Sequence, residues 1–153
     1  MNQKDLKKVS EAAKQIYDYG CYFMSLLYVS EVPYSELTSL DELLKYYDTF
    51  IEKGWMTNEC YVKNPCAILE YFIGKKYSVK KAVVLDSGAD IIIGRWYNPA
   101  TNFHHFVVMD KHNTVVWDSL VDSNTVKNGI LESYRLFYEC KWYCLKFGIG
   151  EAH

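Results

Sequence analysis

Hydrophobic residues in the first half of the chain recur at helical spacing. Over Asp5–Tyr19 the apolar positions lie three or four residues apart and charged side chains fill the positions between them, which is typical of an amphipathic helix. Gly20 breaks this pattern, and the following segment, Cys21–Val32, is apolar almost all round. A helix that is apolar on every side is usually buried. We therefore predict that Cys21 begins the central helix of the fold.

Two further helices are predicted from the residues at their ends. Over Ser39–Gly54, a serine and a glutamate at capping-box spacing precede an apolar pattern that closes on a glycine. Asn64 offers an N-cap in front of a proline, so a helix is expected from Pro65 to Phe72 or Ile73, before a second glycine. The first half of the chain therefore reads as helical throughout.

After Gly74 the pattern changes to short runs of β-branched and aromatic residues separated by turn-forming residues. The predicted strands are Ala82–Leu85, Asp90–Gly94, Phe103–Met109, Thr114–Trp117, Ser133–Cys140 and Trp142–Phe147. The segment Lys111–Asn113 is expected to form the hairpin turn between the third and fourth of these. Helices first and an antiparallel sheet afterwards predict an α+β fold, with the N-terminal helices packed on the C-terminal sheet.

Composition and charge limit the setting in which the protein works. A length of 153 residues fits one domain over residues 1–153. The formal net charge of −2 gives no electrostatic reason to expect nucleic acid or an anionic membrane as a partner. No apolar run approaches the roughly 20 residues that span a bilayer, and the N-terminus lacks the apolar core of a signal peptide. The number of cysteines is odd, so at least one is unpaired within the chain, which fits a reducing compartment. We expect a cytoplasmic protein, whose oligomeric state the sequence leaves open.

The cysteines do not predict a metal site. Cys60 and Cys66 are too far apart for a CxxC pair, and Cys140 and Cys144 have no second close pair of cysteines or histidines beside them. Motifs of nucleotide-binding loops, zincins and serine hydrolases are also missing from the sequence. We therefore expect no cofactor and no metal, with these four thiols packed as small hydrophobic side chains.

Three residues fall where a nucleophilic cysteine site requires them. Cys21 stands at the start of a helix, where the partial positive charge favours thiolate over thiol. His105 opens a hydrophobic strand, and Asp118 ends the next one. The register expected of the hairpin sets Asp118 opposite His105, where a carboxylate fixes the imidazole tautomer and stabilises the imidazolium.

A fourth residue, Gln15, lies six positions before Cys21 and offers a side-chain amide to a developing oxyanion, beside the backbone N–H of Cys21. Alternatives stay open for the other roles. His104 competes with His105 for the base, because adjacent strand residues face opposite sides, and Asp122 is a weaker substitute for the acid. A buried structural thiol and a solvated glutamine are the simpler interpretations of the cysteine and of Gln15.

The order Gln15, Cys21, His105, Asp118 resembles the papain-like cysteine peptidase superfamily. It is most similar to the compact bacterial branch that includes the bacteriocin-leader-processing peptidases, which share the Gln-to-Cys spacing and the Cys-x-x-x-Ser-Leu helix start. The resemblance implies a papain-like α+β fold that cleaves peptide or amide bonds without a metal. The resemblance implies that Cys21 is the nucleophile and His105 the general base. It implies that Asp118 orients the base and that Gln15 donates to the oxyanion.

The chain departs from this branch in three places. Tyr22 follows the nucleophile where the branch has glycine, Gly20 precedes the nucleophile instead, and Ser119 follows the acid where the branch has proline. A bulky Tyr22 narrows the expected cleft, so a catalytically silent papain-like binding or inhibitory module is the alternative hypothesis. A regulatory or structural domain unrelated to papain is the third.

Overall fold

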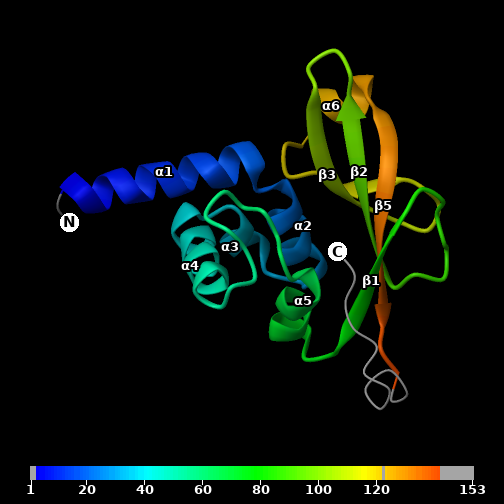
Figure 1. Cartoon of the computed structure of the whole chain (residues 1–153), viewed down its shortest axis with the longest axis horizontal. Helices are drawn as coiled ribbons and strands as arrows, with labels where there is room; N and C mark the ends of the chain where they lie inside the picture. Colours follow the sequence, from blue (N-terminus) through cyan, green and yellow to red (C-terminus); the bar gives the residue numbers. More distant parts are fainter. Residues whose placement is uncertain (1–2, 122, 142–153) are drawn as a thin grey trace.

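The protein consists of a group of helices followed in sequence by an antiparallel sheet, and Figure 1 shows the two side by side. The structure is a computed structural model that describes residues 3–121 and 123–141. Its helices are α1 (Gln3–Tyr19), α2 (Cys21–Val29), α3 (Tyr34–Leu37), α4 (Leu40–Glu52), α5 (Pro65–Ile73) and α6 (Asn124–Asn128). Its strands are β1 (Tyr77–Ala82), β2 (Ile91–Asn98), β3 (Phe103–Met109), β4 (Val115–Trp117) and β5 (Ile130–Glu139). The predicted α+β class is confirmed.

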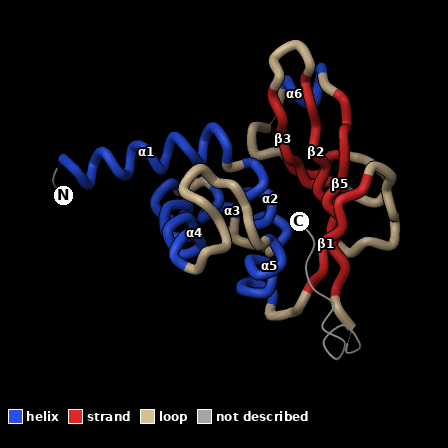
Figure 2. The backbone as a smooth tube through the Cα atoms, in the orientation of Figure 1, coloured by secondary structure: helices blue, strands red, loops and turns tan. Residues whose placement is uncertain are grey.

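Within the described residues the strands form one antiparallel sheet in the order β1-β5-β2-β3-β4. The predicted hairpin turn joins β3 to β4, where the Asp110 N–H donates to the Thr114 carbonyl at 3.0 Å. Figure 2 shows α1 to α5 gathered on one side of the sheet, while the short α6 lies apart from them. The first half of the chain therefore covers one face of the second half.

The helix ends follow the signals in the sequence. The Ser39 hydroxyl accepts from the Glu42 N–H at the start of α4, and the Asn64 side chain accepts from the Ala67 N–H at 3.0 Å at the start of α5. Gly74 ends α5 in the left-handed conformation, with φ of 77°. Such caps satisfy backbone groups that a helix end otherwise leaves without partners.

The main core lies between α2 and the sheet. Phe23, Leu26 and Leu27 of α2 are fully buried and belong to one hydrophobic cluster with Ile93 of β2 and Phe137 of β5. The prediction of a central buried helix is confirmed. A smaller cluster includes Val107 and Ile92, which is the neighbour of Ile93 in β2. The two isoleucines belong to different clusters because successive side chains of a strand point to opposite faces of the sheet.

The first strand was predicted in the wrong place. The structure has β1 at Tyr77–Ala82, whereas Val83 and Val84 of the predicted strand are 79% and 74% exposed. β1 lies at the edge of the sheet and alternates buried Val79 with exposed Lys80, so half of its residues are polar. Val83 and Val84, on which the predicted strand depended, belong instead to the connection that follows β1.

Other boundaries also differ. α2 ends at Val29 rather than Val32, because the chain turns through Glu31 at a φ of 63°. β2 runs on past Gly94 to Asn98. The short helices α3 and α6 were not predicted, and the strand predicted over Trp142–Phe147 lies outside the described residues. No helix in the described part of the chain combines the length and the apolar character that crossing a membrane requires.

Candidate active site

Cys21 is positioned by a sharp junction between α1 and α2. The Gly20 N–H donates to the Ile16 carbonyl at 2.8 Å, and a Cβ at Gly20 would run into that same carbonyl oxygen. Figure 1 shows α2 leaving the line of α1 at this point. Cys21 is therefore the first residue of α2, and no side chain caps this helix end. The N–H groups of a first helical turn have no partner within their own helix, and they carry the partial positive charge of the helix start.

The sulfur of Cys21 meets an open edge of β3. The β4 ladder pairs with Val108 and Met109, and no described strand pairs with the earlier residues of β3 on that side. The Phe106 N–H donates to the Cys21 Sγ at 3.4 Å. Sequence reasoning missed this contact, because a backbone N–H carries no residue-type signal.

His105 and Asp118 form a buried pair. The His105 Nε2 lies 2.6 Å from the Asp118 Oδ1, with 0% and 5% of the two side chains exposed. A β-bulge shifts the hairpin register and the ladder ends at the pair Val108–Trp117, so the two side chains meet just beyond the paired residues. The predicted contact is confirmed, although it does not come from direct cross-strand pairing.

The Asp118 carboxylate is also held by the backbone. Oδ1 accepts from the Leu120 N–H at 2.8 Å and Oδ2 from the Ser123 N–H at 3.3 Å. Burial alone would raise the pKa of Asp118, but the bond with His105 and these N–H donors bring that pKa below its usual 3.8. The carboxylate is therefore fixed in place and charged at neutral pH.

The environment of His105 favours the imidazolium. Burial lowers the pKa of His105, but the bonds with Asp118 and with the Cys21 side chain outweigh it and raise that pKa to about 9. Among the described residues, Nδ1 has no hydrogen-bond partner of acceptable geometry. Because Nε2 is held by Asp118, Nδ1 is the nitrogen left to exchange a proton with Cys21.

Residues 2–139 of the chain match the family model described as "Protein of unknown function, DUF261". The chain belongs to the DUF261 family. Neither the curated proteins nor the solved structures contain a match to it. The matched region of this DUF261 protein includes Gln15, Cys21, His105 and Asp118, so the whole candidate site lies within the family's sequence.

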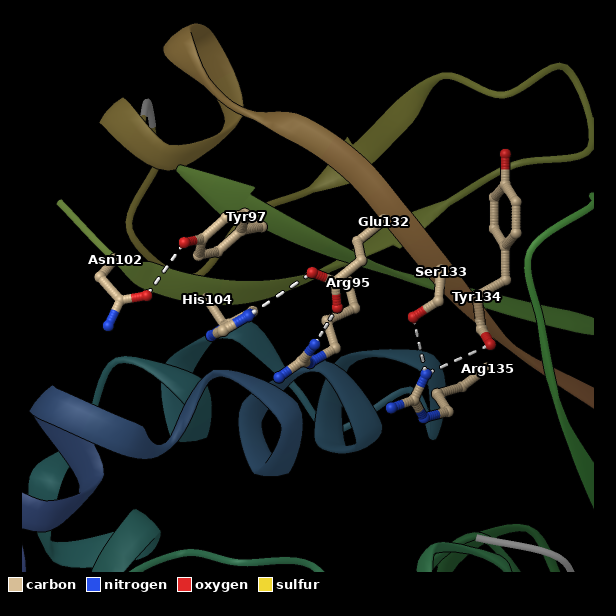
Figure 3. Close-up of polar contacts among 8 residues, drawn as sticks. All are labelled: Arg95, Tyr97, Asn102, His104, Glu132, Ser133, Tyr134 and Arg135. Atoms are coloured by element: carbon tan, nitrogen blue, oxygen red, sulfur yellow. Dashed lines mark hydrogen bonds and ion pairs between the residues drawn. The ribbon is translucent and has the colours of Figure 1, made fainter. Parts of the chain in front are cut away.

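The alternative base in this DUF261 protein, His104, has other partners, although it lines a cavity that also reaches Cys21. Its side chain is 37% exposed, stacks on Tyr97 with ring centroids 4.6 Å apart, and lies 3.6 Å from Glu132 (Figure 3). Asp118 contacts His105 instead. The alternative acid, Asp122, lies outside the described residues.

Gln15 and Cys21 line different cavities. Gln15 lines a separate cavity with Tyr47 and Asn58, and its buried Oε1 has no hydrogen-bond partner in the described part of the chain. Neither of the cavities that reach Cys21 is lined by Gln15. Its role as an oxyanion donor stays a prediction, and the structure offers the Cys21 N–H as the other predicted donor.

Two cavities meet at Cys21 of the DUF261 protein. The first, which we call the Arg135 cavity, has a volume of about 570 Å³, and the second, the His105 cavity, has a volume of about 400 Å³. Phe103 and Asp18 line both of them. A substrate that extends to either side of Cys21 therefore finds room on both sides.

Residues 3–121 and 123–141 contain no group of three or more histidine, cysteine or acidic side chains arranged to hold a metal ion. The Arg135 cavity does gather basic side chains that sequence reasoning did not connect with the site: Lys81, Arg95, His104 and Arg135. The two arginines gave a weak signal, because Arg135 interrupts the hydrophobic run Tyr134–Tyr138 of β5 and Arg95 lies directly before Trp96 and Tyr97 in β2.

Proposed function

We propose that this DUF261 protein is a papain-like thiol hydrolase that cleaves peptide or amide bonds. The observation that carries the proposal is the buried His105–Asp118 pair beside Cys21, at a point where two cavities meet. A nucleophile, a base within reach of it and a third group that orients the base are the parts of a covalent hydrolase. We place the reaction in the cytoplasm, on peptide or amide substrates.

The residues support a sequence of proton transfers that needs no metal. His105 Nδ1 takes the proton from the Cys21 Sγ, while the Phe106 N–H and the imidazolium stabilise the thiolate. The thiolate attacks the carbonyl carbon, and the Cys21 N–H donates to the oxyanion. His105 then protonates the leaving amine. Water, deprotonated by the same imidazole, hydrolyses the thioester and restores the free thiol.

The fold is compatible with the papain-like assignment. The nucleophile begins a buried helix, and the base and the acid come from adjacent strands of the antiparallel sheet against which that helix packs. This is the order and the layout that the resemblance to the papain-like superfamily implies. His105 lies near the start of β3, and Asp118 lies just beyond the end of β4. The proposed base and acid are therefore both near strand ends.

A catalytically silent binding module is the second candidate function. Two observations favour it: Gln15 lines a cavity that Cys21 does not line, and Tyr22 stands beside the thiol. Tyr22 stacks on Phe106 with ring centroids 4.5 Å apart, so an aromatic pair lines the cavity next to the sulfur. A module of this kind uses the same cavity to hold a peptide without cleaving it.

Thiol labelling separates the two candidates. Iodoacetamide labelling is measured from pH 5 to 10 in the parent protein and in His105→Gln, with the labelled site mapped by mass spectrometry. An ordinary thiol titrates near pH 8.5. A thiolate held by the imidazolium keeps reacting down to about pH 6, and that reactivity should collapse in His105→Gln.

His104→Gln is the matched control, because it removes the neighbouring histidine and leaves the Asp118 contact in place. Its labelling profile should follow that of the parent. A Cys21 profile that rises only near pH 8.5 and does not change in His105→Gln would contradict the hydrolase and favour the binding module. Thermal melting of each variant shows that it remains folded.

A further inference from the structure

The Arg135 cavity is lined by an arginine that is itself buried. Arg135 of β5 is only 7% exposed, and its Nη1 donates to the Ser133 Oγ at 3.1 Å and to the Tyr134 carbonyl at 3.4 Å. Figure 3 shows the side chain extending from β5 toward the helices. These two bonds hold one end of the guanidinium, and its remaining donors face the cavity.

Two of the other charged side chains around the cavity, Arg95 and Asp18, are already paired. Arg95 forms an ion pair with Glu132, which also lies 3.6 Å from His104 (Figure 3). On the helical side, Asp18 is held by Lys14 at 2.7 Å. In contrast, no carboxylate in the described part of the chain forms an ion pair with Arg135. Lys81 and Glu59 are exposed at the rim and carry opposite charges, so together they add no net charge to the cavity.

A buried guanidinium without a carboxylate is energetically unfavourable in the free protein. Burial removes most of the solvation of a charged group, and this loss is unfavourable unless a partner compensates it. The ring of Phe106 supplies part of that compensation, since the Arg135 Cζ lies 5.4 Å from its centroid. The remaining donors form the planar fork that matches a carboxylate. An anionic ligand is the missing partner.

We propose that Arg135 binds a carboxylate of the substrate, so that Cys21 acts on acidic peptides or amides whose negative group lies close to the bond that is cleaved. This inference rests on the proposed hydrolase function for the cleavage, but the carboxylate site itself stands on Arg135 and its cavity. The carboxylate comes either from an aspartate or glutamate side chain or from a free C-terminus. Both offer the same two oxygens to the guanidinium.

Matched alkylating probes test the proposal. Bromoacetyl-Glu-amide is compared with bromoacetyl-Gln-amide, and bromoacetyl-Gly with bromoacetyl-Gly-amide. In each reaction the Cys21 sulfur forms a bond to the methylene carbon and bromide leaves. Within at least one pair, the acid should alkylate Cys21 about tenfold faster than its amide, since a charge-assisted bidentate contact is the stronger kind of hydrogen bond. The first pair reports a side-chain carboxylate and the second a terminal one.

Substitutions assign the effect to Arg135. The acid-to-amide ratio should fall to about 1 or below in Arg135→Gln and to an intermediate value in Arg135→Lys, which keeps the charge but loses the fork. Lys81→Gln, at the exposed rim of the same cavity, should change the ratio less than about twofold. If Arg135→Gln fails to fold, as judged by thermal melting, the Arg135→Lys ratio decides. Ratios near 1 for both pairs in the parent protein would overturn the proposal.

A binding measurement keeps this outcome separate from the fate of the hydrolase. NMR titration of Cys21→Ala compares N-acetyl-Glu-amide with N-acetyl-Gln-amide, and N-acetyl-Gly with its amide, so it needs no reactive thiol. If Cys21 proves unreactive while an acid binds about tenfold tighter than its amide, the hydrolase fails and the carboxylate site stands. If Cys21 reacts but neither assay prefers the acid, the hydrolase stands and the carboxylate site fails.

Discussion

The imidazole of His105 is bound to the carboxylate of Asp118 at 2.6 Å in a place that water hardly reaches. The two backbone N–H donors on Asp118 fix the carboxylate, and the carboxylate in turn fixes the ring. The pKa of His105 is raised and that of Asp118 is lowered, so both shifts favour the charged pair. The pair therefore orients His105 toward Cys21 and links the stability of the fold to pH.

Asp118→Asn should destabilise the protein most between about pH 4 and 6.5. The pKa of His105 is about 9 in the folded protein, and its reference value is 6.5. The stabilisation that comes from the charged imidazole is therefore complete below pH 6.5 and is lost as the pH rises through 9. The pKa of Asp118 is lowered from 3.8, so its contribution is present above that pH and is lost in acid. Removing one partner of a buried ion pair costs about 3 kcal/mol, and the expected effect is of that order.

Urea unfolding of the parent protein and of Asp118→Asn at pH 5, 6.5, 8 and 10 measures this difference. Asp110→Asn is the control, because Asp110 lies in the hairpin turn and accepts from the backbone N–H groups of His112 and Thr114. Its effect on stability should not change between pH 6.5 and 9. A constant difference for Asp118→Asn across that range would show that the pair is not charged.

Cys60 gives an internal test of thiol reactivity. Cys60 and Cys21 line the same cavity, but burial raises the pKa of Cys60 to about 12, with a smaller contribution from Cys21. Iodoacetamide should therefore label Cys21 and leave Cys60 unlabelled throughout pH 6–9, by at least about a hundredfold in rate. Peptide mapping after partial labelling measures both sites in one sample. Comparable labelling of the two thiols would mean that access to the cavity, rather than ionisation, controls the reaction.

The sequence predicted the parts of this fold that depend on local signals. Adjacent residues determine the caps at Ser39 and Asn64 and the break at Gly20, and the structure contains all three. The hairpin brings His105 near Asp118 because the two lie only 13 residues apart. Helix ends and short hairpins are decided by a few adjacent side chains, so a single sequence contains enough information to place them.

The parts that it could not predict depend on distant contacts. The Phe106 N–H reaches Cys21 across 85 residues, and no side-chain pattern marks a backbone donor. β1 was misplaced because an edge strand needs few apolar residues and is chosen by its pairing with β5. Gln15 has the spacing to Cys21 that the resemblance requires, yet it lies in a regular helix that directs it to another cavity.

Gly20→Ala should move the nucleophile. A Cβ at this position would collide with the Ile16 carbonyl oxygen, which is a backbone atom and cannot swing aside. The junction between α1 and α2 must then open, at a cost of about 2 kcal/mol or more in the free energy of unfolding. Cys21 labelling at pH 6 should fall with it. Gly88→Ala is the control, because its Cβ would meet only the Asp86 side chain at 3.2 Å, and it should leave both quantities nearly unchanged.

Glu132→Gln should increase the preference for acidic probes. Glu132 neutralises Arg95 and lies beside His104, and both of these line the Arg135 cavity. Removing its charge adds an unpaired guanidinium to a cavity that already holds Arg135. The acid-to-amide ratio of Cys21 alkylation should rise about two- to threefold, and the increase should shrink in high salt because these groups are partly exposed. Glu59→Gln removes a charge from the exposed rim of the same cavity and should raise the ratio less. A ratio in Glu132→Gln that stays at the parent value would mean that Arg95 points away from the bound carboxylate, leaving Arg135 as its only strong partner.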